Sequence, residues 1–496
     1  MRTSQHENTK RTSTSDTSRS ADEYEEHTPR YLREIPQRFP AAMHTASGAL
    51  RSSLLEFREH EVRYARNILP SARLFVLVLI VSVAMGVLAW AFLTSLAWVS
   101  AFRVVYPVSF FSLPLVGIGT AWLYHSYGNG AQKGNNLVIE SALAGRMLQI
   151  RMAVMTFICS VATHFAGGSA GREGTAVQIG GTIASQVSER AKLTPYDHHD
   201  LLLAGVSSAF GAVFGTPLAG AFFGMEMCFV GRLEYNACLY CLVASFTGNA
   251  ITHLLGIHHS KHVIDIIPAL DARMLALTVL AALTFGLVAR LFSSAIHMVK
   301  HMYQSIPASY LVRAAISSGL LLLVYLIAPV KEYAGLSEWM VDAGFAGNTG
   351  FWDIGIKLSL TALTLGAGFQ GGEVTPLFCL GAASGGWLAT MMGLPPALLA
   401  ALGMIAVFGS ALNVPVTTVL LGIDLFGGAA APYFVIVSFV AYLVAGHRGV
   451  YPAQMIVTPK RRSLADDASM SVAEAQARRH KRDIERVKQP LNKRGV

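Results

Sequence analysis

The chain has 496 residues, 53% of them hydrophobic and only 14% charged, with a formal net charge of +9 at pH 7. Because an average soluble domain has roughly 25% charged residues, this composition argues against a soluble protein. It also disfavours nucleic-acid binding, since the basic segment 460–496 contains no Phe, Trp or Tyr to stack on bases. Anionic lipid headgroups are the better partner for the excess positive charge.

Residues 1–70 are expected to form a polar cytoplasmic N-terminal region. Residues 1–30 are rich in Ser, Thr, Arg and Glu and are expected to be disordered. No apolar core of a cleavable signal peptide is evident near the start. Residues 47–66 place leucines among charges and predict an amphipathic helix that leads into the first span. Arginines just before that span place the N-terminus in the cytoplasm by the positive-inside rule.

Two long uncharged stretches predict membrane-spanning helices. Residues 74–102 and 374–423 carry no charge, and both exceed the roughly 20 residues that a spanning helix needs. Glycines and prolines interrupt the second stretch, which therefore predicts several short or tilted helices. Broken backbone within a membrane is tolerated only where it is buried in protein or lines a cavity. The pattern favours a polytopic bundle over a single anchor.

A glycine-rich segment that carries a carboxylate occurs twice, at an offset of 200 residues. Residues 168–175 (GSAGREGT) correspond to residues 368–375 (GFQGGEVT), and a second echo at an offset of 198 pairs Glu226 with Asp424. Two similar halves with interrupted hydrophobic segments are typical of membrane transporters built from repeats. Carboxylates are costly within a membrane, so these acids are expected to be functional.

The two glycine-rich segments predict an anion site. A helix that begins near residues 171–175 directs its unpaired N–H groups and positive dipole end toward the glycine break. A second helix that begins within residues 371–376 would point at the same place, and Pro376 fits its first turn. Such a site binds an anion without fixed positive charge. The alternative is that the glycines only allow close helix packing.

Glu173 at this site is expected to compete with the anion. The ionised carboxylate would occupy the site, whereas the protonated side chain is neutral and can swing aside, which couples protons to anions. The alternative is a structural ion pair between Arg172 and Glu173. A catalytic carboxylate pair of Glu173 and Glu373 in an intramembrane enzyme is disfavoured, because metal-spaced His or Asp residues are absent.

These motifs resemble those of the CLC family of chloride channels and proton-coupled antiporters. Residues 171–175 (GREGT) are similar to its GREGP motif, with Thr in place of Pro. Residues 214–220 (FGTPLAG) and 225–227 (MEM) resemble the helix pair that follows that motif. Residues 372–376 (GEVTP) stand at the GxFxP position. The similarity extends over about residues 74–454.

The departures from the family pattern point to one subgroup. Residues 134–138 (GNNLV) stand where the family has GSGIP, so Asn135 replaces the serine that normally holds chloride. Together with GREGT, GGEVTP and the late residues 449–451 (GVY), this pattern is similar to that of the CLC-type fluoride/proton antiporters of bacteria.

The resemblance implies roles for individual residues. Glu173 would be the gating and proton-coupling glutamate, Tyr451 the tyrosine at the inner end of the site, and Asn135 an anion ligand. Glu373 would be the polar acid of the second-half loop. The other ion-binding residues carried over by position are Gly171, Arg172, Gly174, Thr175, Val374 and Thr375.

Fluoride suits these substitutions because it is small, strongly hydrated and the best hydrogen-bond acceptor among the halides. Asn135 offers two N–H donors where serine offers one, Tyr451 offers a phenol, and a protonated Glu373 would also donate. The alternatives are helix capping by Asn135 and an interfacial aromatic role for Tyr451.

Two further acids lie within apolar sequence. Glu226 is near the position of the family's internal proton-transfer glutamate, so an inner proton relay is one interpretation and structural pairing at a subunit interface is the other. The only sign that Asp424 matters is its correspondence to Glu226 in the repeat, and no mechanistic role is assigned to it. The histidine cluster His258, His259 and His262 is not assigned either, and a metal site there is disfavoured.

The expected protein is therefore an all-α polytopic membrane protein of CLC type, with two inverted-topology repeats and broken, re-entrant helices. Its transmembrane domain would cover residues 71–457, with halves at about 74–273 and 274–454, and a basic cytoplasmic tail would follow at 458–496. We expect a homodimer in the inner (plasma) membrane, with both termini cytoplasmic, that exports fluoride in exchange for protons. The resemblance implies no cofactor, no metal and no enzymatic activity. The alternative is a chloride/proton antiporter or a voltage-gated-type chloride channel of the same fold.

Overall fold

A computed structural model describes residues 46–259 and 262–488 of the chain. It divides into two units, Met1–Leu69 and Pro70–Val496. The described part of the first unit is the beginning of helix α2, where the sequence predicted a helix over residues 47–66. The disorder expected for residues 1–30 lies outside the described residues.

The described residues are helical apart from two short strands and the connections, which confirms the all-α class. In chain order the elements are α2 (Ala46–Val105), η2 (Pro107–Ser112), α3 (Leu113–Tyr127), η3 (Ala131–Lys133), α4 (Asn135–Ala144), α5 (Ile150–Ala166), α6 (Glu173–Ala191), α7 (Pro195–Phe214), α8 (Pro217–Glu226), β1 (Phe229–Val230), η4 (Tyr235–Ala237), α9 (Cys238–Leu254), α10 (Ala272–Ser305), α11 (Tyr310–Ile327), η5 (Lys331–Tyr333), α12 (Trp339–Phe345), α13 (Phe351–Gly366), α14 (Val374–Met392), α15 (Pro396–Leu412), α16 (Pro415–Phe426), η6 (Gly428–Ala430), α17 (Ala431–Ala445), β2 (Met455–Ile456), η7 (Arg462–Asp467) and α18 (Val472–Lys488).

Seven helices among the described residues are long and apolar enough to cross a membrane. They cover Ser71–Val105, Pro107–Tyr127, Tyr235–Leu254, Ala272–Ser305, Tyr310–Ile327, Val374–Met392 and Gly428–Ala445. Shorter apolar helices lie between them, including α5, α15 and α16. The uncharged stretch 374–423 thus forms three helices, α14, α15 and α16, as its glycines and prolines predicted.

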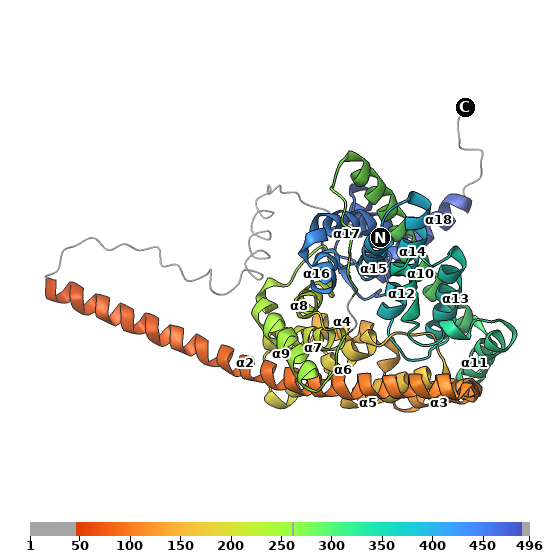
Figure 1. Ribbon diagram of the computed structural model, residues 1–496. Coiled ribbons are helices and arrows are strands. Elements are labelled where there is room, and N and C mark those ends of the chain that lie inside the picture. The colour runs from red at the N-terminus through yellow and green to blue at the C-terminus, as the bar shows by residue number, and fades with distance from the viewer. Residues whose placement is uncertain (1–45, 260–261, 489–496) are drawn as a thin grey trace, which may run out of the picture. The chain divides into compact units, whose positions relative to one another are not determined.

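The repeat seen in the sequence is also a repeat of packing. In the first half α7 contacts α6, α8 and α9, and in the second half α15 contacts α14, α16 and α17 (Figure 1). Glycines allow the closest of these contacts. A Cβ added at Gly180 of α6 would lie 2.4 Å from the carbonyl oxygen of Gly205 in α7, and one at Gly381 of α14 would lie 2.3 Å from that of Gly403 in α15. Backbone-to-backbone packing of this kind is common in membrane helices.

Each half also contains a matching break between two helices. Gly215 directly follows α7 and Asn413 directly follows α15, and both have a left-handed backbone, at φ 72° and 62°. The next helices begin with Pro217 and Pro415, whose fixed φ suits the first helical position. These residues make α8 and α16 separate short helices instead of continuations.

The acids at the ends of α8 and α16 cap one another's helix. Glu226, the last residue of α8, accepts hydrogen bonds from the backbone N–H groups of Val416 (3.0 Å) and Thr417 (2.8 Å) in the first turn of α16. Asp424, near the end of α16, accepts one from the N–H of Ala219 (2.9 Å) in the first turn of α8. Each carboxylate thus satisfies exposed N–H groups and meets the positive end of the other helix dipole. Capping of α8 thus gives Asp424 a structural role, whereas the sequence analysis assigned it none.

The described part of the C-terminal tail packs against the membrane unit. Strand β2 pairs in parallel with β1, and helix α18 follows it in the tail. Nε2 of His447 accepts a hydrogen bond from the N–H of Lys460 (3.0 Å), so this nitrogen carries no hydrogen and the ring is neutral. Its Nδ1 donates to Asp467 (2.8 Å), and burial lowers the pKa of the ring. These contacts fix the path of the chain between α17 and α18.

The reciprocal capping predicts a stability effect at Asp424. Replacing Asp424 with Ala leaves N–H groups of α8 without an acceptor, which should cost about 1 kcal/mol and lower the melting temperature by a few degrees. Asp424→Asn should retain most of the stability, because Asn is also a good capping residue. Thermal melts of the detergent-solubilised protein, followed by size-exclusion chromatography, measure both variants. Equal melting temperatures for the parent and Asp424→Ala would refute a capping role.

Candidate functional site

The two glycine-rich segments meet directly. Gly171 and Gly372 exchange two backbone hydrogen bonds, each with an N to O distance of 2.6 Å. A Cβ at Gly171 would lie 2.9 Å from the backbone nitrogen of Thr375, and one at Gly372 would lie 2.6 Å from that of Gly174. Only glycine therefore allows this approach. The bridge brings the beginning of α6 and the beginning of α14 together, as the sequence predicted.

The carboxylate of Glu173 occupies the N-terminal end of the opposite helix. Glu173 is the first residue of α6 and its side chain is 1% exposed. It accepts hydrogen bonds from the backbone N–H of Thr375 (3.0 Å) and from the hydroxyl of Thr375 (2.7 Å to either oxygen). Thr375 is the second residue of α14, so the carboxylate lies where the positive end of that helix attracts an anion.

Arg172 links this carboxylate to the neighbouring turn. Its guanidinium lies 3.4 Å from Glu173 and 3.2 Å from the partly exposed Glu338. The backbone N–H of Arg172 also donates to Glu173 (3.2 Å). The ion pair that was considered as an alternative is therefore present, together with the hydrogen bonds from Thr375.

Asn135 and Tyr451 lie next to this position and contact each other. Asn135 begins α4, and its side-chain nitrogen donates to the hydroxyl oxygen of Tyr451 (3.1 Å). Because Asn135 is the donor, the hydroxyl hydrogen of Tyr451 remains available for a further acceptor. A Cβ at Gly174 would lie 2.9 Å from the Asn135 amide nitrogen and 2.9 Å from a carboxylate oxygen of Glu373. Gly174 thus leaves space in which these side chains come together.

Two oxygens in this cluster lack hydrogen-bond donors among the described residues. They are Oδ1 of Asn135 and Oε2 of Glu373, both buried. Leaving such acceptors unpaired costs free energy. A proton on Glu373 would remove the negative charge of its carboxylate and turn the group into a hydrogen-bond donor. The geometry therefore suits a group that gains and loses a proton.

A cavity of about 710 Å³ reaches this cluster. Asn135, Glu373 and Gly371 form part of its wall. The cationic side chains of Lys133, Lys300 and Arg313 also line it, as do His125 and His297. Lys133 is paired with Glu140 (2.8 Å). Positive charge along a cavity raises the local concentration of anions. Sequence reasoning missed Lys300, which lies in the C-terminal part of α10.

Other residues proposed from the sequence contribute in different ways. Val374 is the first residue of α14 and is buried. Thr175 is also buried, but its hydroxyl donates to Ser160 of α5 (3.1 Å), so it braces α6 against α5. Asn136 accepts from the N–H of Ala453 (3.0 Å) and ties α4 to the segment that carries Tyr451.

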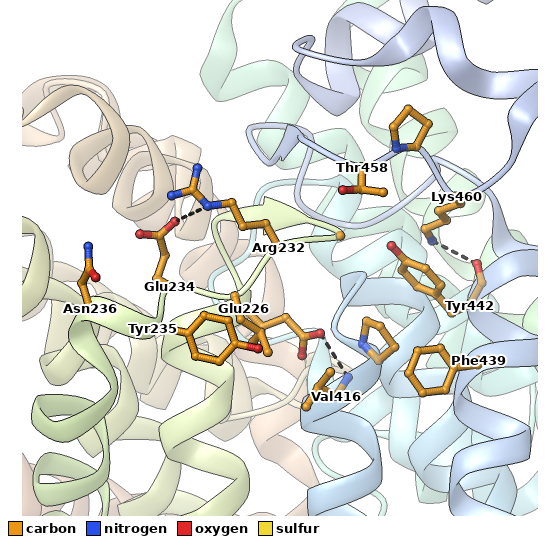
Figure 2. A pocket seen from close by; sticks show the side chains of 14 residues that line it. Glu226, Arg232, Glu234, Tyr235, Asn236, Val416, Phe439, Tyr442, Thr458 and Lys460 are labelled. Carbon is orange, nitrogen blue, oxygen red and sulfur yellow. Dashed lines mark hydrogen bonds and ion pairs between the residues drawn. The ribbon is translucent and has the colours of Figure 1, made fainter. Parts of the chain in front are cut away.

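Glu226 lies elsewhere, on a second cavity of about 710 Å³. Figure 2 shows its carboxylate directed at Val416, with Arg232 and Lys460 among the labelled residues around the cavity. Besides the two N–H groups at the start of α16, the hydroxyl of Thr417 donates to Glu226 (2.7 Å). Glu226 thus borders a cavity, and both of its oxygens accept hydrogen bonds.

No group of three His, Cys, Asp or Glu side chains within residues 46–259 and 262–488 is placed to hold a metal ion. The described histidines of the cluster do not converge. His262 contacts Asp342 (2.9 Å), whereas the ring of His258 packs against that of His253.

Comparison with known proteins gives this geometry a family context. Residues 116–446 match the family model described as voltage gated chloride channel. The chain is 35% identical over 401 residues to a chloride/fluoride channel protein of Pseudomonas syringae pv. tomato, covering 79% of this chain and 88% of that protein. It is 25% identical over 328 residues to an H(+)/Cl(-) exchange transporter of Vibrio cholerae, covering 61% of this chain and 69% of that protein.

Comparison with solved structures points to the same family. The fold is similar to the crystal structure of a CLC-type fluoride/proton antiporter, with a TM-score of 0.75 and 32% identity, covering 78% of this chain and 98% of that chain. A slow cyanobacterial Cl-/H+ antiporter shares the fold alone, with a TM-score of 0.65 at 19% identity, over 76% of this chain and 96% of that chain. The resemblance seen in the motifs is confirmed, and the protein is a multi-pass membrane protein of the voltage-gated chloride channel (CLC) family.

Proposed function

We propose that the protein is a secondary transporter that exports fluoride from the cytoplasm in exchange for protons. The observation that carries this proposal is the position of Glu173, a titratable carboxylate bound by Thr375 at the start of α14. An anion and this carboxylate compete for the same donors. Protonation removes the negative charge of Glu173, weakens its hold on Thr375 and frees the donors for the anion.

The selectivity for fluoride would come from the donors around Asn135. Its amide nitrogen and the free hydroxyl hydrogen of Tyr451 offer concentrated hydrogen bonding to a small ion. Glu373, which borders the cavity and has an unpaired oxygen, would donate when protonated and repel the anion when ionised. Similarity to the chloride/fluoride channel protein of Pseudomonas and to the CLC-type fluoride/proton antiporter supports this substrate.

The wider arrangement follows from the same proposal. Residues 71–457 would form the transport domain of a homodimer in the inner membrane, surrounded by lipid, with both termini in the cytoplasm. The remaining ion-binding roles proposed from the sequence, for Gly171, Arg172, Gly174, Thr175 and Val374, would be exercised through backbone N–H groups and through support of the helix starts. A chloride/proton antiporter or chloride channel is the alternative, supported by the name of the Vibrio relative.

Ion efflux from proteoliposomes, recorded with a halide electrode and a pH electrode together, tests the proposal. We expect fluoride efflux accompanied by proton uptake, and much slower chloride efflux. Glu173→Gln cannot ionise, so it should abolish the proton movement. Equal rates for fluoride and chloride would exclude the fluoride assignment, and halide efflux by the parent protein without a pH change would exclude antiport.

Asn135→Ser tests the source of selectivity. Serine provides one hydrogen-bond donor where asparagine provides two, so fluoride transport should fall by about tenfold or more, the effect of losing roughly 1.5–3 kcal/mol from a hydrogen bond to a charged group. Chloride transport should fall less. Leu137→Ala, a change on the same helix outside the proposed ion contacts, serves as the control. An unchanged ratio of fluoride to chloride rates in Asn135→Ser would place selectivity elsewhere.

Glu226 is a candidate inner proton relay because it borders the second cavity, but it also caps α16. Glu226→Gln distinguishes the two roles, since glutamine cannot carry a proton yet retains an oxygen acceptor. A relay predicts that proton uptake is lost while the melting temperature stays within a few degrees of the parent. If proton uptake persists in the folded variant, Glu226 is a capping residue only.

A further inference from the structure

A fully buried lysine lies close to the anion site without a carboxylate partner. Lys357 in α13 is 0% exposed. Its ammonium donates to the carbonyl oxygens of Gly335 (2.9 Å) and Tyr333 (3.2 Å) and to the hydroxyl of Ser337 (2.9 Å). Within the described part of the chain its hydrogen-bond acceptors are neutral, and no ion pair involves it.

Burying such a lysine lowers the stability of the folded protein, because its charge is removed from water. Neutral acceptors offset only part of the desolvation of a buried charge, and an apolar side chain of similar length would avoid that cost. A favourable interaction with a negative charge nearby would compensate. The half-buried Arg103 is a second cation at the same turn, since a Cβ at Gly335 would lie 2.6 Å from its guanidinium.

The turn that holds Lys357 lies between the two segments of the anion site. The N–H of Gly335 donates to the carbonyl of Gly168 in the first glycine-rich segment (3.2 Å). The thiol of Cys379 in α14 contacts the carbonyl of Ser337 (3.3 Å). Glu338, the next residue, pairs with Arg172 (3.2 Å). Because Arg172 is shared between Glu338 and Glu173, its charge is already balanced, whereas that of Lys357 is not.

We infer that Lys357 supplies fixed positive charge to the anion site, which stabilises the halide and also the ionised Glu173 that replaces it. This inference rests on the proposed anion transport. The site would then depend on two kinds of attraction. The helix ends supply directed donors, and the lysine supplies a charge that acts through the 335–338 turn without touching the ion. Attraction to the negative charge in the site would also explain why the buried face of α13 contains a lysine.

Ser337 allows the charge to be cancelled while the lysine stays in place. In Ser337→Asp the new carboxylate would lie beside the ammonium, because the serine oxygen is 2.9 Å from it. The backbone of Ser337 has a φ of 56°, a left-handed conformation that Asp and Asn adopt more readily than most residues. Ser337→Asn is therefore a matched neutral control.

Fluoride binding to the detergent-solubilised protein, measured by isothermal titration calorimetry, tests the inference. We expect Ser337→Asp to bind fluoride about tenfold more weakly than the parent, because in general a unit charge acting over on the order of 10 Å at an effective dielectric constant of about 20 has an effect of this order. Ser337→Asn should bind like the parent. Lys357→Met should weaken binding similarly, whereas Lys331→Gln, which removes an exposed lysine from η5, should not.

The outcomes are distinct. Parent-like affinity in folded Ser337→Asp overturns the inference, as does loss of folded protein with Ser337→Asp but not with Ser337→Asn. Should Lys357→Met fail to give a monodisperse protein, the two variants at Ser337 decide alone. A parent protein that neither binds nor transports a halide would instead refute the proposed function.

Discussion

The pairing of Gly171 with Gly372 is the contact on which the site depends. Two short backbone hydrogen bonds join the halves where their helices α6 and α14 begin, and the neighbouring atoms leave no room for a side chain at either position. The joined segments cannot move apart without breaking both bonds. If the protein transports ions as proposed, rocking of one half against the other would break these bonds, whereas rotation of the Glu173 side chain would not.

Three acids within this bundle are bound by the first turns of helices. Glu173 accepts from the start of α14, Glu226 from the start of α16 and Asp424 from the start of α8. A helix start can stabilise a carboxylate in an apolar environment because it combines free N–H groups with a favourable dipole. The same physical device thus serves two purposes: in the proposed function the carboxylate at the start of α14 competes with an anion, whereas the carboxylates at the starts of α8 and α16 cap those helices.

Sequence reasoning predicted the fold and the meeting of the two glycine-rich segments, because the helix breaks and helix starts are encoded locally. The repeated glycines and acids predicted that α6 and α14 begin at one place, and the breaks at prolines predicted short helices. Other contacts between distant segments could not be predicted. Nothing near Lys357 in the sequence indicates that its ammonium contacts the turn at Gly335, and the hydroxyl of Thr175 bonds to Ser160, a residue on another helix.

The exchange of caps between α8 and α16 has a consequence for how the chain is made. Glu226 is synthesised well before α16, the helix that it caps. The N–H groups at the start of α8 are likewise synthesised before Asp424, their acceptor. Until the second half has been made, the acid at the end of α8 and the N–H groups at its start therefore lack these partners. The contact between α8 and α16 can be completed only when both halves have been synthesised.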